Sequence, residues 1–168
     1  MKNVIYFLLT CFLMLSTACE NGDEETDPNI VKGTWELSKE DESDDQEVYY
    51  VETYTFMADG TYENRAFNRD AESGELSCYY RISSGTYNRS GNKLILNASV
   101  RLYNPENCGS EEELVDYDDG EPIDSIELIF EITNQGTELT LDYGPCSDMC
   151  PPNAFCICIG PQTYTKVD

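Results

Sequence analysis

Apolar and polar residues alternate with a period of two through much of this chain. In residues 93–102 one face carries Leu94, Leu96, Ala98, Val100 and Leu102. In residues 123–133 one face carries Ile126, Leu128, Phe130 and Ile132. A period of two is typical of β-strands with one buried face, whereas a helix repeats every 3.6 residues. The pattern predicts an all-β fold, and no segment predicts a helix.

Eight segments show this alternation or are rich in β-branched and aromatic residues. They are residues 33–37, 49–57, 61–67, 78–89, 93–102, 123–133, 137–143 and 162–167. Asp59-Gly60 is a strong hairpin signal between the second and third segments, and Gly91 and Gly136 mark further turns. We expect an antiparallel up-and-down barrel of eight strands, because closure leaves no exposed edge. A two-sheet β-sandwich is the alternative.

The first residues have the layout of a secretory signal peptide, which we assign to residues 1–18. Lys2 precedes an apolar run over residues 4–15, and small residues 16–18 lie directly before Cys19. The apolar run is short for a membrane-spanning helix. Small residues followed by cysteine resemble the lipobox of bacterial lipoproteins, in which the cysteine is acylated, for example with palmitate. The alternative is an ordinary signal peptide with an incidental cysteine.

Residues 19–29 predict a flexible acidic tether, because they offer little apolar surface to bury. The lipobox resemblance implies that Cys19 anchors this tether in the bacterial outer membrane, on its periplasmic face or at the cell surface. Residues 30–168 then form one domain. The chain has 10 Lys and Arg, 33 Asp and Glu and no His, giving a formal net charge of −23. That charge repels nucleic acid, so we expect no nucleic-acid partner.

Cysteine usage predicts disulfides, because an exported chain meets an oxidising environment. Apart from Cys11 in the signal peptide and Cys19, the cysteines are Cys78, Cys108, Cys146, Cys150, Cys156 and Cys158. The turn at residues 90–92 sets a register that brings Cys78 within reach of Cys108. A bond between Cys156 and Cys158 would be strained, so we expect these two to pair with Cys146 and Cys150, in an order that stays open.

These last four cysteines staple the loop at residues 144–161 in that interpretation. A zinc site is the rival reading, but the spacing is not the usual pair of C-x2-C motifs and the chain has no histidine. Residues 41–47 and 116–121 are rich in carboxylates without the spacing of a calcium loop. We expect no bound metal and no cofactor.

The absence of histidine removes the usual general base and the Ser-His or Cys-His nucleophile pair. The many carboxylates fall in loops and on polar faces, where acidic side chains are ordinarily solvated. We therefore expect a protein that is not an enzyme.

Gly33-x-Trp35 at the start of the first strand resembles the lipocalin signature. The succession Tyr54-Thr55-Phe56, Asp59-Gly60-Thr61-Tyr62, Gly85-Thr86-Tyr87 and Gly91-Asn92-Lys93-Leu94 is similar to lipocalin-like lipoproteins of Gram-negative bacteria, over residues 30–167. The resemblance implies that Trp35 plugs the closed end of the barrel. It also implies that a basic residue of the last strand, here Lys166, packs over the tryptophan ring.

Tyrosine is abundant, with 12 residues, and it suits a half-polar interior. A ligand cavity in the barrel would be lined by Tyr54, Phe56, Tyr62, Tyr80, Ile82, Leu96, Leu128 and Phe130. One hypothesis is a lipid-anchored protein that binds a small apolar or amphipathic ligand there. The alternative is a structural or interaction protein whose interior is filled by side chains and whose acidic loops meet a protein partner. A connected void, open at one end, distinguishes the first from the second.

Overall fold

The computed structural model describes residues 30–41, 48–71, 73–106, 108–116, 125–144 and 159–167. These residues form nine β-strands and two short 3₁₀ turns. The strands are β1 (Gly33–Asp41), β2 (Val48–Phe56), β3 (Thr61–Asp70), β4 (Leu76–Ser90), β5 (Lys93–Tyr103), β6 (Val115–Asp116), β7 (Ile126–Thr133), β8 (Glu138–Asp142) and β9 (Gln162–Lys166); the turns are η1 (Glu111–Glu113) and η2 (Asn134–Gly136). The prediction of an all-β chain is confirmed.

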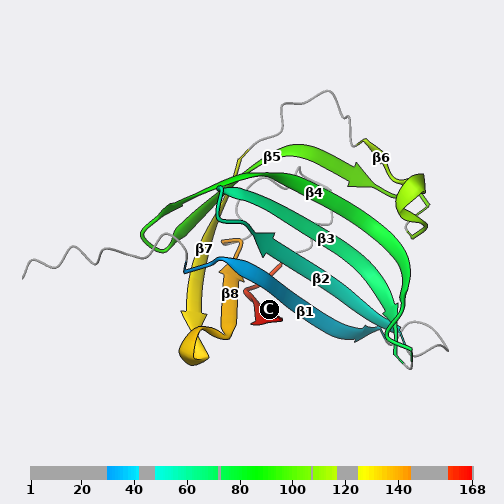
Figure 1. The fold of residues 1–168 in the computed structure, drawn as a ribbon, viewed down its shortest axis with the longest axis horizontal. Coiled ribbons are helices and arrows are strands. Elements are labelled where there is room, and N and C mark those ends of the chain that lie inside the picture. The colour runs from blue at the N-terminus through cyan, green and yellow to red at the C-terminus, as the bar shows by residue number, and fades with distance from the viewer. Residues whose placement is uncertain are drawn as a thin grey trace, which may run out of the picture.

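All nine described strands belong to one antiparallel sheet whose order closes roughly in a ring. The order is β4-β3-β2-β1-β9-β8-β7-β5-β6, and a further pairing joins β4 to β5. Figure 1 shows β1 to β5 as a long curved wall, with β7 and β8 opposite and the C-terminal end beside β1. The two-sheet alternative is wrong for these strands. The extra strand is the short β6, which pairs with β5 through two residues.

Two glycine turns fix the hairpins that build the curved wall. Gly60 adopts φ 84° and Gly91 adopts φ 61°, a region that residues with a Cβ atom rarely enter. Between β2 and β3, the Asp59 carboxylate accepts hydrogen bonds from the Thr61 backbone N–H at 3.0 Å and from the Thr61 hydroxyl at 2.6 Å. The Asp-Gly signal thus forms the expected hairpin between β2 and β3. The preceding pair, β1 and β2, is also antiparallel and extends over nine residues.

The ring closes between β1 and β9. Only two residue pairs hold this joint in register, Trp35 with Lys166 and Glu36 with Thr165. A backbone hydrogen bond from Val167 to Thr34, at 3.0 Å, extends it by one step. The first and last described strands are therefore neighbours.

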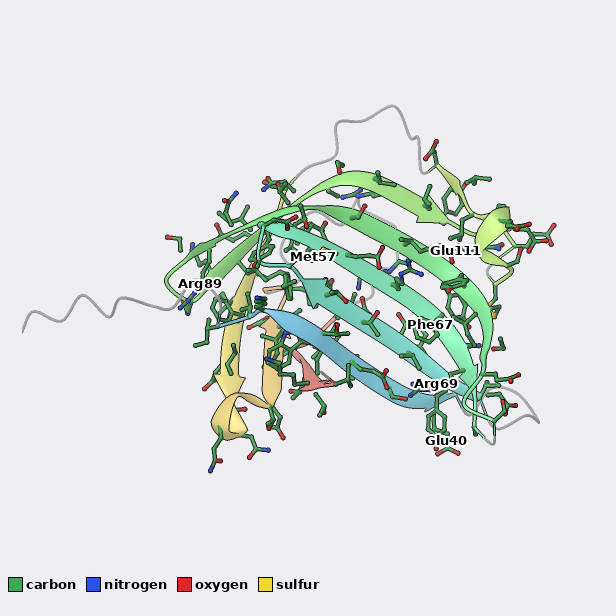
Figure 2. All side chains as sticks on the ribbon, in the orientation of Figure 1. Glu40, Met57, Phe67, Arg69, Arg89 and Glu111 are labelled. Atoms are coloured by element: carbon green, nitrogen blue, oxygen red, sulfur yellow. A yellow bond between two sulfur atoms is a disulfide. The ribbon has the colours of Figure 1, made fainter. Side chains whose placement is uncertain are left out.

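A single apolar core fills one end of the ring, with side chains from both walls. Its buried members are Val31, Trp35, Tyr54, Phe56, Tyr62, Leu94, Leu96, Leu128, Phe130, Leu139, Leu141 and Tyr164. In Figure 2, Met57 and Arg89 mark this end of the curved wall, whereas Glu40 and Arg69 lie at the other. Burying a side chain of this size contributes about 1.5–3 kcal/mol. The core therefore stabilises the end of the ring that contains Trp35.

Two bulges change which residues of β4 and β5 share a face. Tyr80 is skipped between the pairs Ala66–Arg81 and Phe67–Tyr79, and Ser99 is skipped between Gly85–Ala98 and Ser84–Val100. The expectation that Val100 shares the face of Leu94 is wrong, because the residue inserted at Ser99 reverses the alternation directly beyond it. Val100 is accordingly 40% exposed, whereas Leu94 is fully buried.

Several predictions fall outside the described residues. They are the signal peptide and tether with Cys19, the cysteines Cys146, Cys150, Cys156 and Cys158, and nearly all of the two carboxylate-rich segments. They stay predictions.

Candidate functional site: a cavity with a polar floor

A cavity of about 490 Å³ lies between the two walls of the ring. Its charged, amide and hydroxyl lining comes from Glu52, Asn64, Arg81, Ser83 and Arg101, and its tyrosines are Tyr54, Tyr62, Tyr103 and Tyr143. The apolar lining is Ile82, Leu96, Leu102, Ile126 and Ile159. Glu52, Tyr54, Tyr62 and Asn64 are buried, whereas Tyr103, Ile126 and Ile159 are exposed. The cavity thus has a buried, largely polar floor and an exposed rim.

Cross-strand pairing places the lining side chains in two rows across β2, β3, β4 and β5. One row is Tyr54, Asn64, Ser83 and Arg101, and the next is Glu52, Ala66, Arg81 and Tyr103. Directly opposed residues of an antiparallel sheet point to the same face with their Cβ atoms about 4.5–5.5 Å apart. The bulge at Ser99 brings Arg101 and Tyr103 into these rows, because without it their neighbours would take those places.

Glu52 is the centre of the polar floor. Its Oε1 accepts a hydrogen bond from Asn64 Nδ2 at 3.0 Å and a charged one from Arg81 at 2.6 Å. Its Oε2 accepts from the hydroxyl of Tyr164 at 3.3 Å. The Glu52 side chain is 8% exposed and that of Arg81 is 48% exposed. A buried carboxylate is costly unless it is paired and hydrogen-bonded, and Glu52 has partners on both oxygens.

Three tyrosine hydroxyls continue this network from Glu52. Tyr164 shares a hydrogen bond of 3.4 Å with Tyr143, which shares another of 3.1 Å with Tyr54. Burial, together with the nearby Glu52 carboxylate, raises the pKa of Tyr164 and of Tyr143 above the ordinary value. Burial and Tyr143 raise the pKa of Tyr54 in the same way. These hydroxyls are therefore neutral at physiological pH and act as hydrogen-bond donors and acceptors.

Two arginines supply positive charge to the cavity. Burial lowers the pKa of Arg81, and the attraction of Glu52 and of the neighbouring tyrosines more than offsets this, so the pKa lies above its ordinary value. Arg101 is half-buried, and no hydrogen bond or ion pair of its side chain is present in the described part of the chain. Among the described lining residues Glu52 is the one acidic side chain, so their charges sum to 2 − 1 = +1.

Trp35 is a member of the apolar core that adjoins the cavity. Its ring nitrogen donates to the backbone oxygen of Val31 at 2.7 Å, and the side chain is fully buried. The Nζ of Lys166 lies 5.2 Å from the centroid of the indole ring and donates to the backbone oxygen of Lys32 at 3.0 Å. Gly33 follows Lys32 directly in the sequence and adopts φ 121°, where a Cβ atom is unfavourable.

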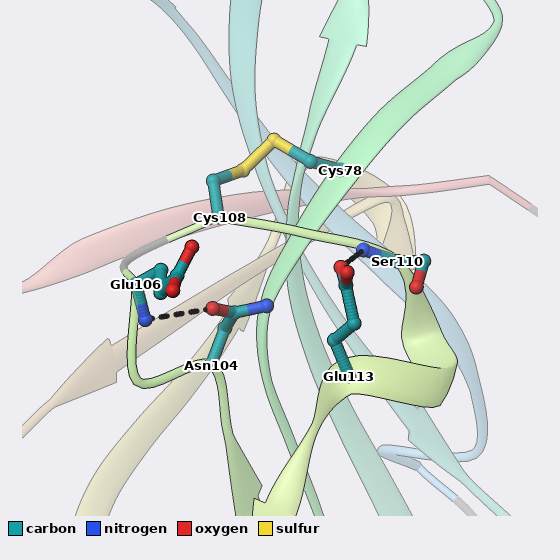
Figure 3. The surroundings of a disulfide bond; sticks show 6 residues. All are labelled: Cys78, Asn104, Glu106, Cys108, Ser110 and Glu113. Carbon is teal, nitrogen blue, oxygen red and sulfur yellow. Dashed lines mark hydrogen bonds between the residues drawn. A yellow bond between two sulfur atoms is a disulfide. The ribbon is translucent and has the colours of Figure 1, made fainter.

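A disulfide between Cys78 and Cys108 ties the segment after β5 back to the start of β4, with a Cα–Cα distance of 5.4 Å. This is the pair that the turn register brought within reach. Figure 3 shows the segment that it holds: Asn104 Oδ1 accepts from the Glu106 backbone N–H at 2.9 Å, and Glu113 Oε2 accepts from the Ser110 backbone N–H at 2.7 Å. Neither of these two cysteines lines the cavity.

The structure divides the residues predicted to line a cavity into two groups. Tyr54, Tyr62, Ile82 and Leu96 line it, whereas Phe56, Leu128 and Phe130 are buried in the core. Tyr80 instead packs against Tyr50, with ring centroids 5.7 Å apart.

Sequence reasoning missed the charged floor. Glu52 occupies the same face as Tyr54 and Phe56, and Asn64 the same face as Tyr62, so a polar residue on an apolar face was the available signal. Arg81 and Arg101 carried no such signal. For Arg101, the bulge at Ser99 reverses the simple alternation, and a bulge is not visible in the sequence.

Within the described residues, no helix has the length and apolar character needed to cross a membrane. In the same part of the chain, no three histidine, cysteine or carboxylate side chains come together as they would around a metal ion. No protein-family model, curated protein or solved structure matches the chain.

Proposed function

We propose that this chain is an exported, lipid-anchored protein that binds a small amphipathic molecule inside an eight-stranded lipocalin-like barrel. The observation that carries the proposal is the cavity of about 490 Å³ with its buried floor and exposed rim. Ligand sites in proteins commonly have about 300–1,000 Å³, with mostly apolar walls and a few fixed polar groups. A solid interior, as a purely structural or interaction protein would have, offers no such space.

The barrel interpretation is supported by the order of the strands. Leaving β6 aside, each described strand is paired with two neighbours, so β1 to β5 and β7 to β9 make a circuit of eight, and β6 is an addition to β5. The position of Lys166 over Trp35 agrees with what the lipocalin resemblance implies for the closed end. In this proposal the cavity adjoins the closed end, and a ligand would enter it from the exposed rim.

The anchor and the location rest on the sequence of residues 1–29. We propose that Cys19 is acylated and holds the domain at the outer membrane through the acidic tether. Feeding the exporting cells an alkyne analogue of palmitate tests this directly. The wild-type chain should carry the label and the Cys19→Ala variant should not; label on the variant, or none on the wild type, would remove the anchor from the proposal.

Native mass spectrometry tests the binding function. Residues 20–168 contain every described strand, so we would export this form without the anchor cysteine and compare gentle with denaturing conditions. We expect a reproducible extra mass that is lost on denaturation. A bare mass under gentle conditions would contradict a resident ligand.

Two adjacent serines provide a matched pair of variants. Ser83 lines the cavity and pairs with Asn64 and Arg101, whereas Ser84 pairs with Val100 on the other face of the sheet. Ser83→Trp should fill the cavity and reduce the fraction of chain that carries the extra mass, and Ser84→Trp should leave it unchanged. Equal occupancy in the two variants would place the bound molecule elsewhere.

A further inference from the structure

We propose that the ligand of this cavity carries one anionic group of the carboxylate class, which Arg101 binds, and an apolar body that packs on the rim. The inference rests on the proposed function, and it selects among amphipathic molecules by charge. It follows from the charges in the cavity, from the pairing of Arg101 with its cross-strand neighbours and from the arrangement of apolar side chains.

The charge of the cavity is opposite to that of the chain. The lining residues that the structure describes contain two guanidinium groups and one carboxylate, a sum of +1, whereas the whole chain carries −23. Glu52 is already bound to Arg81 at 2.6 Å. This leaves Arg101 as the lining cation with no ion-pair partner among the described residues. A ligand with a single negative charge would balance the lining.

The surroundings of Arg101 suit an anion. Its row on the inner face contains Ser83, Asn64 and Tyr54, which are uncharged. The hydroxyls of Ser83 and Tyr62 lie 3.5 Å apart and provide further donors near the same row. A guanidinium presents several N–H groups in a planar fork that matches the two oxygens of a carboxylate.

An apolar body has a defined place to pack. Leu96 is buried in the wall of the cavity, and Ile126 and Ile159 are exposed at its rim. Ile126 pairs with Leu96 across β5 and β7, so the two side chains lie on the same face. An amphipathic anion would cover these exposed side chains while its head group meets Arg101. A cation of the same size would be attracted by the overall charge of the chain but repelled at this point.

Calorimetric titration with three ligands of equal chain length tests the inference. The probes are decanoate, decan-1-ol and decyltrimethylammonium, titrated at low ionic strength into the exported form of residues 20–168 after its resident ligand has been removed by denaturation, gel filtration and refolding. Decanoate should bind at least about tenfold more tightly than the other two, because charge-assisted hydrogen bonds are roughly twice as strong as neutral ones. Added salt should weaken decanoate binding more than decanol binding.

Two arginine variants locate the effect. Arg101→Gln should lower the affinity for decanoate by about tenfold and leave that for decan-1-ol unchanged, and Arg101→Lys should restore part of the loss. Arg65→Gln removes the same charge outside the cavity lining, where Arg65 pairs with Glu63 at 2.6 Å, and should change neither affinity. Thermal unfolding of each variant separates a loss of binding from a loss of fold.

The outcomes separate this inference from the proposed function. If decan-1-ol binds as tightly as decanoate, or if Arg101→Gln leaves decanoate binding unchanged, the anionic ligand is refuted while a binding cavity stands. If decyltrimethylammonium binds most tightly, the overall negative charge of the chain determines which ligand binds, and the anionic ligand is refuted. If none of the three binds and native mass spectrometry shows a bare chain, the binding function itself fails.

Discussion

The hydroxyl of Tyr164 donates to Glu52 Oε2 at 3.3 Å and so links two strands whose contacting residues lie 112 positions apart. The other oxygen of Glu52 binds Asn64 on β3 and Arg81 on β4. One carboxylate thus connects four strands, β2, β3, β4 and β9, under the floor of the cavity. It fixes the shape of the floor as well as its charge.

Glu52→Gln should lower the free energy of unfolding by about 1–3 kcal/mol, because a charged hydrogen bond is lost while Arg81 keeps contact with water. Urea unfolding followed by tryptophan fluorescence measures the change. Glu63→Gln is the matched control, since the pair of Glu63 with Arg65 is about one-third exposed on each side and should contribute at most about 1 kcal/mol. Equal losses in the two variants would show that the central position of Glu52 is unimportant.

Alkaline pH should destabilise the fold. Burial, then the Glu52 carboxylate, raises the pKa of Tyr50 to about 12, and the pKa values of Tyr54, Tyr143 and Tyr164 are also raised. Below pH 10 both the folded and unfolded forms keep these protons, so the contribution is fully present. Between about pH 10 and 12 the unfolded chain releases them first, and each group removes about 1.4 kcal/mol per pH unit.

Urea titrations at pH 7, 9, 10 and 11 measure this dependence. The chain has no histidine, so stability should change little between pH 6 and 8. A free energy of unfolding that stays level up to pH 11 would contradict the burial of these hydroxyls.

The contact between Lys166 and Trp35 should appear as a coupling energy. A cation within about 6 Å of an aromatic centroid contributes about 0.5–1 kcal/mol at an exposed site, and the distance here is 5.2 Å. We expect that energy in a double-mutant cycle of Trp35→Leu and Lys166→Gln, measured by chemical denaturation. Additive effects of the two substitutions would remove the stacked cation as a source of stability. Trp35→Leu alone should cost more, because it also removes the hydrogen bond to Val31.

Replacing both Cys78 and Cys108 by alanine should lower the free energy of unfolding by about 3–4 kcal/mol, as expected for a closed loop of this length. The separation of the two residues is 30 positions. Denaturant unfolding of the oxidised protein and of the double variant gives the difference, and reduction of the wild-type chain should reproduce at least that loss. An unchanged midpoint in the double variant would mean that this bond constrains little.

Gly85→Ala should destabilise the chain by more than about 1 kcal/mol, because an added Cβ would meet the backbone of Asn97 and Ala98 at the bulge. Gly160 is the control, since a Cβ there meets nothing within 4 Å. Thermal unfolding of the two alanine variants should differ clearly. Similar midpoints would show that β4 and β5 can separate at the bulge without cost.

The strands could be predicted because their signals are local. The Asp59-Gly60 turn, the alternation of residues 126–133 and the aromatic β2 each specify a strand or turn within a few residues. The predicted limits were mostly right within three residues, but β1 continues to Asp41 through residues predicted to be loop. Its pairing with β2 over nine residues extends it, and such pairing overrides local composition.

The cavity could be predicted only in part. Tyr54 and Leu96 follow from alternation, whereas Arg101 reaches the cavity through the extra residue at Ser99. A single inserted residue exchanges the two faces of every position beyond it, and nothing in the side chains around Ser99 announces the insertion. The charged group on which the ligand proposal depends was therefore hidden in the sequence.

The ring closes only when β1 pairs with β9, which is the last of the described strands to be synthesised. Strands β1 to β5 are joined by successive pairings and can assemble as soon as each has been synthesised, because their contacts are local. The other edge of β1 must wait for residues about 130 positions later. Until then it is an open strand edge, and a chain interrupted before residue 162 would keep that edge available for pairing with other chains.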